Sequence, residues 1–301
     1  MRTSTAVFAA LGFVAALAGS TYATAVPVVL ANGVHTIDLQ TNGSGVTPMN
    51  VTYDPGQAKY YSGRGGNETG PLYVWDTAGN QLQSFTPTGI DLRSLNFNAN
   101  TGDIEAVTFD AKNGGGPFGT QGLVRMNRTA GGLFQNPNAQ ILASMPGLPG
   151  SQTMPAYNAA TNQFYAREGS ATVNVVSRVD GSLAGTVNLD VVAAGNPPLV
   201  TNGLGYDSFF DVFVELDVMN NRAEVFDING NFLGQSALAG LANVDPNYGM
   251  GYANGQIFVY DGADNRWEGF RIFEAAAPEP DSIALLGLGL AGLGFSRRKK
   301  A

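Results

Sequence analysis

Histidine and cysteine, the side chains used most often for nucleophilic catalysis and for binding transition metals, are nearly absent from this chain of 301 residues. There is no cysteine, which excludes disulfides, thiolate metal sites and cysteine nucleophiles. The single histidine, His35, would have to serve any Ser-His-Asp triad or histidine metal site. Because His35 lies in a predicted outer strand near the start of the chain, we expect it to be an exposed strand residue, and we predict no metal site.

Carboxylates are the remaining catalytic option, because a pair of Asp or Glu side chains can hydrolyse a glycosidic bond. Two of the candidates, Asp54 and Asp207, follow a predicted strand at a position where a turn favours Asp in any case. Since no conspicuous carboxylate pair emerges, we assign no catalytic residue and keep hydrolysis of carbohydrate as the alternative. The full set of candidates on predicted inner strands is Asp54, Glu105, Asp110, Glu168, Asp207 and Glu215.

Two oxygen-rich turns have the spacing of a calcium loop. In the first, Asp227, Asn229 and Asn231 alternate along the chain as the early ligands of an EF-hand do. The second is the stretch 261–265, Asp-Gly-Ala-Asp-Asn. Neither ends in the bidentate Glu of an EF-hand, and Asp or Asn in a hairpin turn serves the backbone first. We therefore predict no cofactor, with Ca²⁺ as the alternative.

Two long glycine-rich segments, 62–70 and 112–122, are the predicted ligand-binding loops. Long insertions between the strands of a repeated sheet tend to lie on one face and to carry binding function. We expect Arg64, Phe118 and Arg125 to contact the ligand.

These candidates lie in a sequence that repeats itself. Strands that end in an aromatic residue and a polar turn recur, with the aromatic residue at positions 53, 97, 157, 206 and 252, which lie 44, 60, 49 and 46 residues apart. The second half of each repeat is a pair of strands around a turn rich in Asp, Asn and Gly, as in 223–233, which is typical of an antiparallel hairpin. Four strands at such a spacing are what a blade of a β-propeller requires.

The predicted fold is therefore all-β, a β-propeller of five blades, or six if the interval of 60 residues contains a degenerate blade. The last repeat, 248–273, has room for only three strands, so we expect the strand over 34–40 to complete it and close the ring. Trp75-Asp76 with Gly79-Asn80 resembles the blades of NHL and related extracellular propeller repeats. A β-sandwich is the alternative fold.

The first 25 residues have the features of a signal peptide. Arg2 gives a positive start, 6–18 is a small and apolar run, and Ala23-Thr24-Ala25 fits the small-x-small pattern for cleavage after Ala25 by signal peptidase. We expect the chain to be exported, with residues 26–274 forming the exported domain.

The C-terminal segment, 275–301, combines three signals. Pro278-Glu279-Pro280 precedes a short apolar run, 283–295, and the chain ends in the basic cluster Arg297, Arg298, Lys299 and Lys300. The run is shorter than the roughly 20 residues that cross a bilayer comfortably, and the cations would hold its end in the cytoplasm. This tail resembles the sorting tail of PEP-CTERM proteins. The resemblance implies a short transmembrane helix, processing by an exosortase, and an envelope of the Gram-negative type.

The charge of the exported chain limits its partners. Leaving out the five cations of the two terminal segments, 11 of the 16 Lys and Arg remain against 24 Asp and Glu, a net charge near −13 if the chain is kept as far as Asp281. An acidic surface argues against binding to nucleic acid, which needs clustered cations.

The sequence thus predicts a non-enzymatic protein that passes through an inner-membrane intermediate to the cell surface or the extracellular matrix of a biofilm. Its expected partners are exopolysaccharide or an envelope protein, besides the two processing enzymes. The alternative is a secreted carbohydrate-active hydrolase that uses propeller carboxylates.

Overall fold

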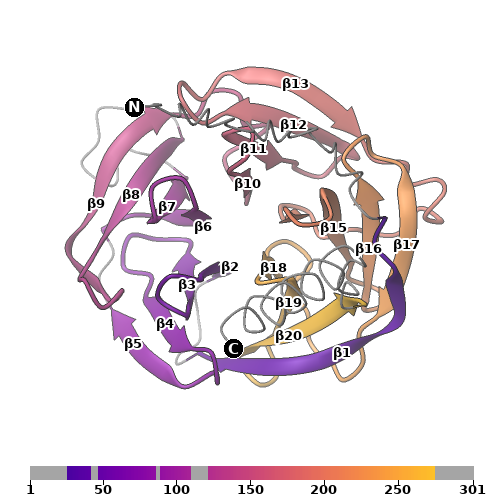
Figure 1. Cartoon of the computed structure of the whole chain (residues 1–301), viewed down its shortest axis with the longest axis horizontal. Coiled ribbons are helices and arrows are strands. Elements are labelled where there is room, and N and C mark those ends of the chain that lie inside the picture. Colours follow the sequence, from indigo (N-terminus) through magenta and orange to yellow (C-terminus); the bar gives the residue numbers. More distant parts are fainter. Residues whose placement is uncertain (1–25, 42–46, 86–88, 110–120, 275–301) are drawn as a thin grey trace, which may run out of the picture.

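The computed structural model describes residues 26–41, 47–85, 89–109 and 121–274, and their regular elements are all strands (Figure 1). This confirms the all-β prediction for the described part of the chain. No helix there is long and apolar enough to cross a membrane. The predicted signal peptide with Ala23 and Ala25, the sorting tail with its basic cluster, Asp110 and Phe118 all lie outside the described residues.

Three sheets each contain four antiparallel strands in sequence order. The first consists of β2 (Thr47–Asp54), β3 (Lys59–Gly65), β4 (Leu72–Asp76) and β5 (Gln81–Phe85). The second consists of β6 (Leu92–Asn98), β7 (Asp103–Thr108), β8 (Gly122–Arg128) and β9 (Phe134–Ser144). The third consists of β10 (Ala156–Asn158), β11 (Gln163–Ala166), β12 (Thr172–Ser177) and β13 (Leu183–Asn188).

The fourth sheet has eight strands in the order β14-β15-β16-β17-β1-β20-β19-β18. One half is β14 (Gly205–Asp207), β15 (Val212–Asp217), β16 (Arg222–Asp227) and β17 (Phe232–Ala237). The other half is β18 (Met250–Ala253), β19 (Gln256–Asp261), β20 (Arg266–Phe273) and β1 (Val29–Gln40). The halves meet where β1 runs parallel to β17, with Asn32 opposite Ala237. The described strands therefore make five four-strand units.

β1 completes the last unit, as the sequence predicted. It pairs antiparallel with β20 along most of its length, for example with His35 opposite Phe270 and Gln40 opposite Arg266. The chain's first described strand therefore covers the edge that its last described strand would otherwise expose.

The units stand in a ring, with the first strand of each towards the centre and the last at the outside (Figure 1). Neighbouring inner strands contact one another in the cyclic order β2, β6, β10, β14, β18 and back to β2. The alternative, a sandwich of two facing sheets, does not match this arrangement.

Apolar side chains fill the spaces between neighbouring units. Between the first and last units, Trp75 and Trp267 are fully buried in one cluster. Each indole N–H has a partner across that boundary: Trp75 Nε1 donates to the Gln40 carbonyl at 2.9 Å, and Trp267 Nε1 donates to Ser62 Oγ at 3.1 Å. Because both rings are buried and hydrogen-bonded, the boundary between the chain's two ends is packed as a core.

Glycines in the turns between third and fourth strands let one unit approach the next. Gly230 has φ +89°, and a Cβ there would lie 2.1 Å from the carbonyl oxygen of Asn188, at the end of β13 in the preceding unit. Gly79 approaches Asp38 of β1 in the same way. Only glycine tolerates both this backbone and this contact, which explains the glycine in the repeated hairpin turn.

Candidate functional site

The aromatic residues that revealed the repeat lie at the ends of the five inner strands. They are Tyr53, Phe97, Tyr157, Tyr206 and Tyr252, on β2, β6, β10, β14 and β18. Each is half-buried, whereas the residue that follows it is buried in every case. The repeat thus presents one partly exposed ring per unit around the axis of the molecule, at one end of the inner strands.

The residue after each ring stabilises the turn to the second strand. Asp207 Oδ1 accepts a hydrogen bond from the Phe209 amide at 2.8 Å, and Asp54 Oδ1 accepts one from the Gln57 amide at 3.1 Å. Asn98 and Asn158 do the same for the amides two residues ahead. The predicted turn role of Asp54 and Asp207 is confirmed.

The tyrosine hydroxyls connect neighbouring units. Tyr252 donates to Oδ2 of Asp207 at 2.6 Å, and Tyr206 accepts from Nδ2 of Asn158 at 2.9 Å. Burial, and then the charge of Asp207, raises the pKa of Tyr252 well above its usual value. The Tyr252 hydroxyl therefore stays protonated and donates. The faces of the tyrosine rings are not used in these bonds and can form the walls of a cavity.

Two adjoining cavities, which we call together the axial cavity, lie between these rings. The larger has a volume of about 330 Å³ and is lined by rings from all five inner strands and by Phe209, whose side chain is 66% exposed at the rim. The smaller, about 80 Å³, is lined by residues one to three positions earlier on the strands, including Asn50 and Asn96. The walls shared by the two are Thr52, Phe97, Tyr157, Tyr206 and Tyr252.

The lining of the axial cavity suits binding better than catalysis. Among the described residues, its only acidic side chain is Asp207, and no Lys, Arg or His lines it. Hydrolysis by paired carboxylates needs an acid and a base or nucleophile that flank the same bond. A half-apolar pocket with a few polar groups is the usual form of a small-ligand site.

The other predicted carboxylates are held by partners elsewhere. Asp54 pairs with Arg128 at 2.7 Å. Glu105, on β7, accepts a hydrogen bond from Nε of Arg178 at 2.8 Å. Glu168 accepts one from Thr153 at 3.3 Å. These side chains neutralise cations or satisfy donors within the fold, and none of them lines the axial cavity.

Glu215, on β15, is fully buried beside Arg167, whose Nη1 lies 3.1 Å from its Oε2. Burial raises the pKa of Glu215 to about 8, and Arg167 only partly offsets this shift. A carboxyl with a raised pKa is typical of a general acid, but Glu215 has no access to the axial cavity. We assign it a structural role.

The side chains predicted to bind ligand lie apart from the aromatic rings. Arg64 lies on β3, not in a loop, and is buried, with Nη2 donating to the hydroxyls of Tyr260 at 2.6 Å and Thr41 at 2.9 Å. Arg125 lies on β8, partly exposed, 3.8 Å from Asp103 and hydrogen-bonded to Gln140. Arg64 and Arg125 thus lie on strands of two different sheets.

The predicted calcium turn is satisfied by its own amides. Asp227 Oδ1 accepts from the amides of Asn229 and Asn231 at 2.9 and 2.8 Å, and Oδ2 accepts from the Asn231 side chain at 2.7 Å. Burial opposes ionisation of Asp227, but the hydrogen bonds from Asn231 and Asn229 outweigh it and lower the pKa. In the other predicted turn, both carboxylate oxygens of Asp261 likewise accept hydrogen bonds from backbone amides.

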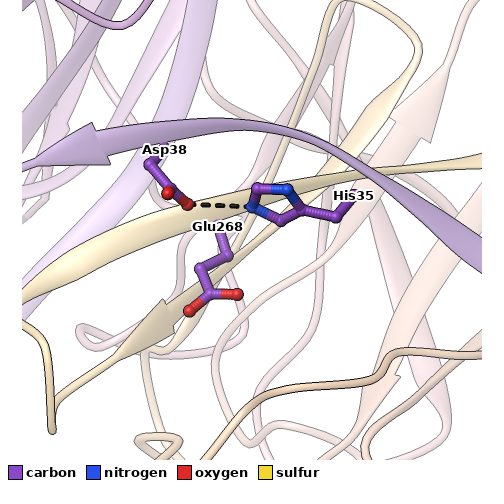
Figure 2. Close-up of side chains that lie close together, drawn as sticks. All are labelled: His35, Asp38 and Glu268. Atoms are coloured by element: carbon purple, nitrogen blue, oxygen red, sulfur yellow. Dashed lines mark hydrogen bonds and ion pairs between the residues drawn. The ribbon is translucent and has the colours of Figure 1, made fainter.

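Among the described residues, two groups have ligand atoms close enough together to hold a metal ion. One is Asp261, Asp264 and Glu268, and in it Arg266 pairs with Asp264 at 3.1 Å. The other is His35, Asp38 and Glu268, on β1 and β20 (Figure 2). Nε2 of His35 lies 2.9 Å from Asp38, and the ring packs edge-on against Phe270. Arg266 already supplies a positive partner, since its guanidinium lies 2.9 Å from Glu268 and 3.5 Å from Asp38. The cluster is therefore an ion-pair network on the outer edge of the ring. His35 is exposed, as the sequence predicted.

Comparison with known proteins identifies the tail. Residues 276–299 match the family model described as the PEP-CTERM protein-sorting motif, which confirms the sequence-based identification. The motif marks an exported protein that is processed by an exosortase at the cell envelope. No curated protein matches the chain.

Among solved structures, the chain is similar to a structural genomics protein of unknown function from Bacteroides thetaiotaomicron VPI-5482, with a TM-score of 0.45 and 12% identity. The match covers 76% of this chain and 60% of that one, so this chain spans less than two thirds of its neighbour's length.

The signal for the axial cavity lies in the same aromatic positions that indicate the repeat. Phe97 and Tyr157, two of these positions, line the axial cavity, whereas the predicted binding residues Arg64 and Arg125 do not. A side chain that recurs at the same position of every inner strand must face the axis together with its equivalents, and this symmetry is the signal that points to the site.

Proposed function

We propose that this is an exported, exosortase-processed surface or matrix protein, folded as a five-bladed β-propeller, whose axial cavity binds extracellular polysaccharide. The observation that carries the proposal is the convergence of five half-buried aromatic rings on one cavity. The function rests on that site and on the sorting motif together.

The propeller is supported by the strand order and by the contacts between units. Each four-strand unit would be one blade, running from the axis outwards, and β1 would complete the fifth blade. The cyclic contacts of the inner strands and the turn glycines at blade boundaries are what a closed ring requires. The resemblance to NHL repeats stays a prediction.

Aromatic walls favour a sugar ligand for a physical reason. One face of a pyranose ring carries mainly C–H groups, which lose unfavourable contact with water when they stack on the flat face of Tyr or Phe. The hydroxyls of the sugar edge would meet acceptors and donors such as Asn96 and Asn254, which line the cavity. A cavity of about 330 Å³ has room for one or two sugar units of a longer chain.

The route to the surface completes the proposal. Signal peptidase would cleave after Ala25, the short apolar run before Arg297 would hold the chain in the inner membrane, and an exosortase would act at Pro278-Glu279-Pro280. A binding domain released at the surface by this route would meet the polymers that surround the cell.

The test is co-sedimentation of the purified full-length protein with the host's own extracellular polysaccharide, with reducing sugar ends assayed in the same tube. We expect retention without new reducing ends. Phe209→Ala, which removes an exposed ring from the rim, should weaken retention. Met219→Ala removes another exposed side chain, from the turn at the opposite end of β15, and should not. New reducing ends would favour the hydrolase instead, and no retention would contradict the proposed function.

A further inference from the structure

We propose that the axial cavity selects a polysaccharide that carries protonated amines, such as a glucosamine polymer with free amino groups. The inference rests on the proposed glycan-binding function and specifies, in addition, that the ligand is positively charged. It follows from the charges at one repeated position and from the aromatic walls beside it.

The residue after each aromatic ring determines the charge of the axial cavity. In the first unit this residue is Asp54, and Arg128 neutralises it at 2.7 Å. In the second and third units it is Asn98 and Asn158, and in the fifth it is Ala253, all of them uncharged. Only in the fourth unit is it an acid, Asp207, that forms no ion pair with a described Lys, Arg or His.

No described cation therefore neutralises Asp207 in the cavity wall. Its partners are neutral donors, namely the amides of Phe209 and Phe210 and the hydroxyl of Tyr252. These bonds fix the orientation of the carboxylate but do not cancel its charge. Asp211 does not line the axial cavity; it accepts the hydroxyl of the wall residue Tyr206 at 2.7 Å.

The rings and the Asp207 carboxylate favour the same kind of ligand. The face of an aromatic ring attracts a cation, and the attraction grows when water is excluded, which is why aromatic cages recognise ammonium groups. The axial cavity offers Tyr157, Tyr206 and Tyr252 beside Asp207, and no described Lys, Arg or His lines it. The carboxylates of a uronic acid polymer would be repelled by the carboxylate of Asp207.

The experiment compares three hexasaccharides on the full-length protein by titration calorimetry at about pH 5.5, where aliphatic amines are protonated. They are a glucosamine hexamer, an N-acetylglucosamine hexamer and a galacturonic acid hexamer. We expect the glucosamine hexamer to bind at least about tenfold more tightly than the N-acetylated one. The galacturonic acid hexamer should show no binding.

Two variants tie the preference to the cavity. Asp207→Asn removes the charge but keeps an acceptor for the turn amides. Asp211→Asn is the matched control, because it removes a nearby carboxylate that does not line the axial cavity. Asp207→Asn should weaken glucosamine binding by about tenfold more than it weakens N-acetylglucosamine binding, whereas Asp211→Asn should weaken both much less. A single cooperative melting transition is the check that each variant folds. Equal binding of the neutral and cationic hexamers, or none of the glucosamine hexamer, would overturn this inference. The proposed function would still stand if the host polysaccharide is retained.

Discussion

The hydroxyl of Tyr252 lies 2.6 Å from Oδ2 of Asp207, which joins the inner strand β18 to its neighbour β14. Tyr252→Phe removes this bond, and because the acceptor is a buried carboxylate we expect a loss of about 1.5–3 kcal/mol in the free energy of unfolding. Urea unfolding followed by tryptophan fluorescence measures it. Tyr53→Phe is the matched control, since the Tyr53 hydroxyl bonds no described residue, and it should change stability by less than about 0.5 kcal/mol. Equal effects of the two variants would refute this role for Tyr252.

The buried Glu215 predicts how stability depends on pH. Its pKa in the folded protein, about 8, lies above its ordinary value of 4.5. Between these values the folded chain holds a proton that the unfolded chain has lost, so stability is highest near the lower value and falls as pH rises, by about 1 kcal/mol per unit. Glu215→Gln should flatten this part of the profile. A wild-type profile that rises through the same window would contradict the assignment.

Gly230 tests how closely the units pack. An alanine there takes an unfavourable φ of +89° and places Cβ 2.1 Å from the Asn188 carbonyl oxygen. Gly230→Ala should cost about 2–4 kcal/mol. Gly102→Ala has a similar φ of +75° but no atom within 4 Å of its Cβ, and should cost only the backbone strain of about 1–2 kcal/mol. Thermal melts of both variants separate the cost of backbone strain from the cost of the steric contact. Equal losses of stability in the two variants would mean that the contact at Gly230 is relieved without cost.

The cluster of His35, Asp38 and Glu268 predicts no response to chelation. Arg266 lies within ion-pair distance of both acids, so a divalent cation would have to displace a guanidinium. We expect the melting temperature to stay the same when EDTA is added to the purified protein. A fall on chelation that is restored by Ca²⁺ or Zn²⁺ would show that a metal ion is bound, at this cluster or at the adjoining group of Asp261, Asp264 and Glu268.

The sequence predicted the repeat, the all-β architecture and the pairing of the first strand with the last, because each depends on local alternation and spacing. The role of individual charges did not follow, because it depends on partners distant in sequence. Arg64, predicted to be a loop cation, is buried and donates hydrogen bonds to Thr41 and Tyr260, which are distant in sequence. Asp54 and Asp207 occupy the same position of the repeat, and only Arg128, 74 residues away from Asp54, makes them different.

The central claim is that the aromatic rings around the axis hold the sugar, and a crystal structure of the protein soaked with an oligosaccharide cut from the retained host polymer tests it most directly. We predict electron density for sugar rings stacked against Tyr157, Tyr206 and Tyr252 in the axial cavity. Sugar bound instead beside Arg125 on the outer part of the second unit, with the axial cavity holding only water, would contradict the claim.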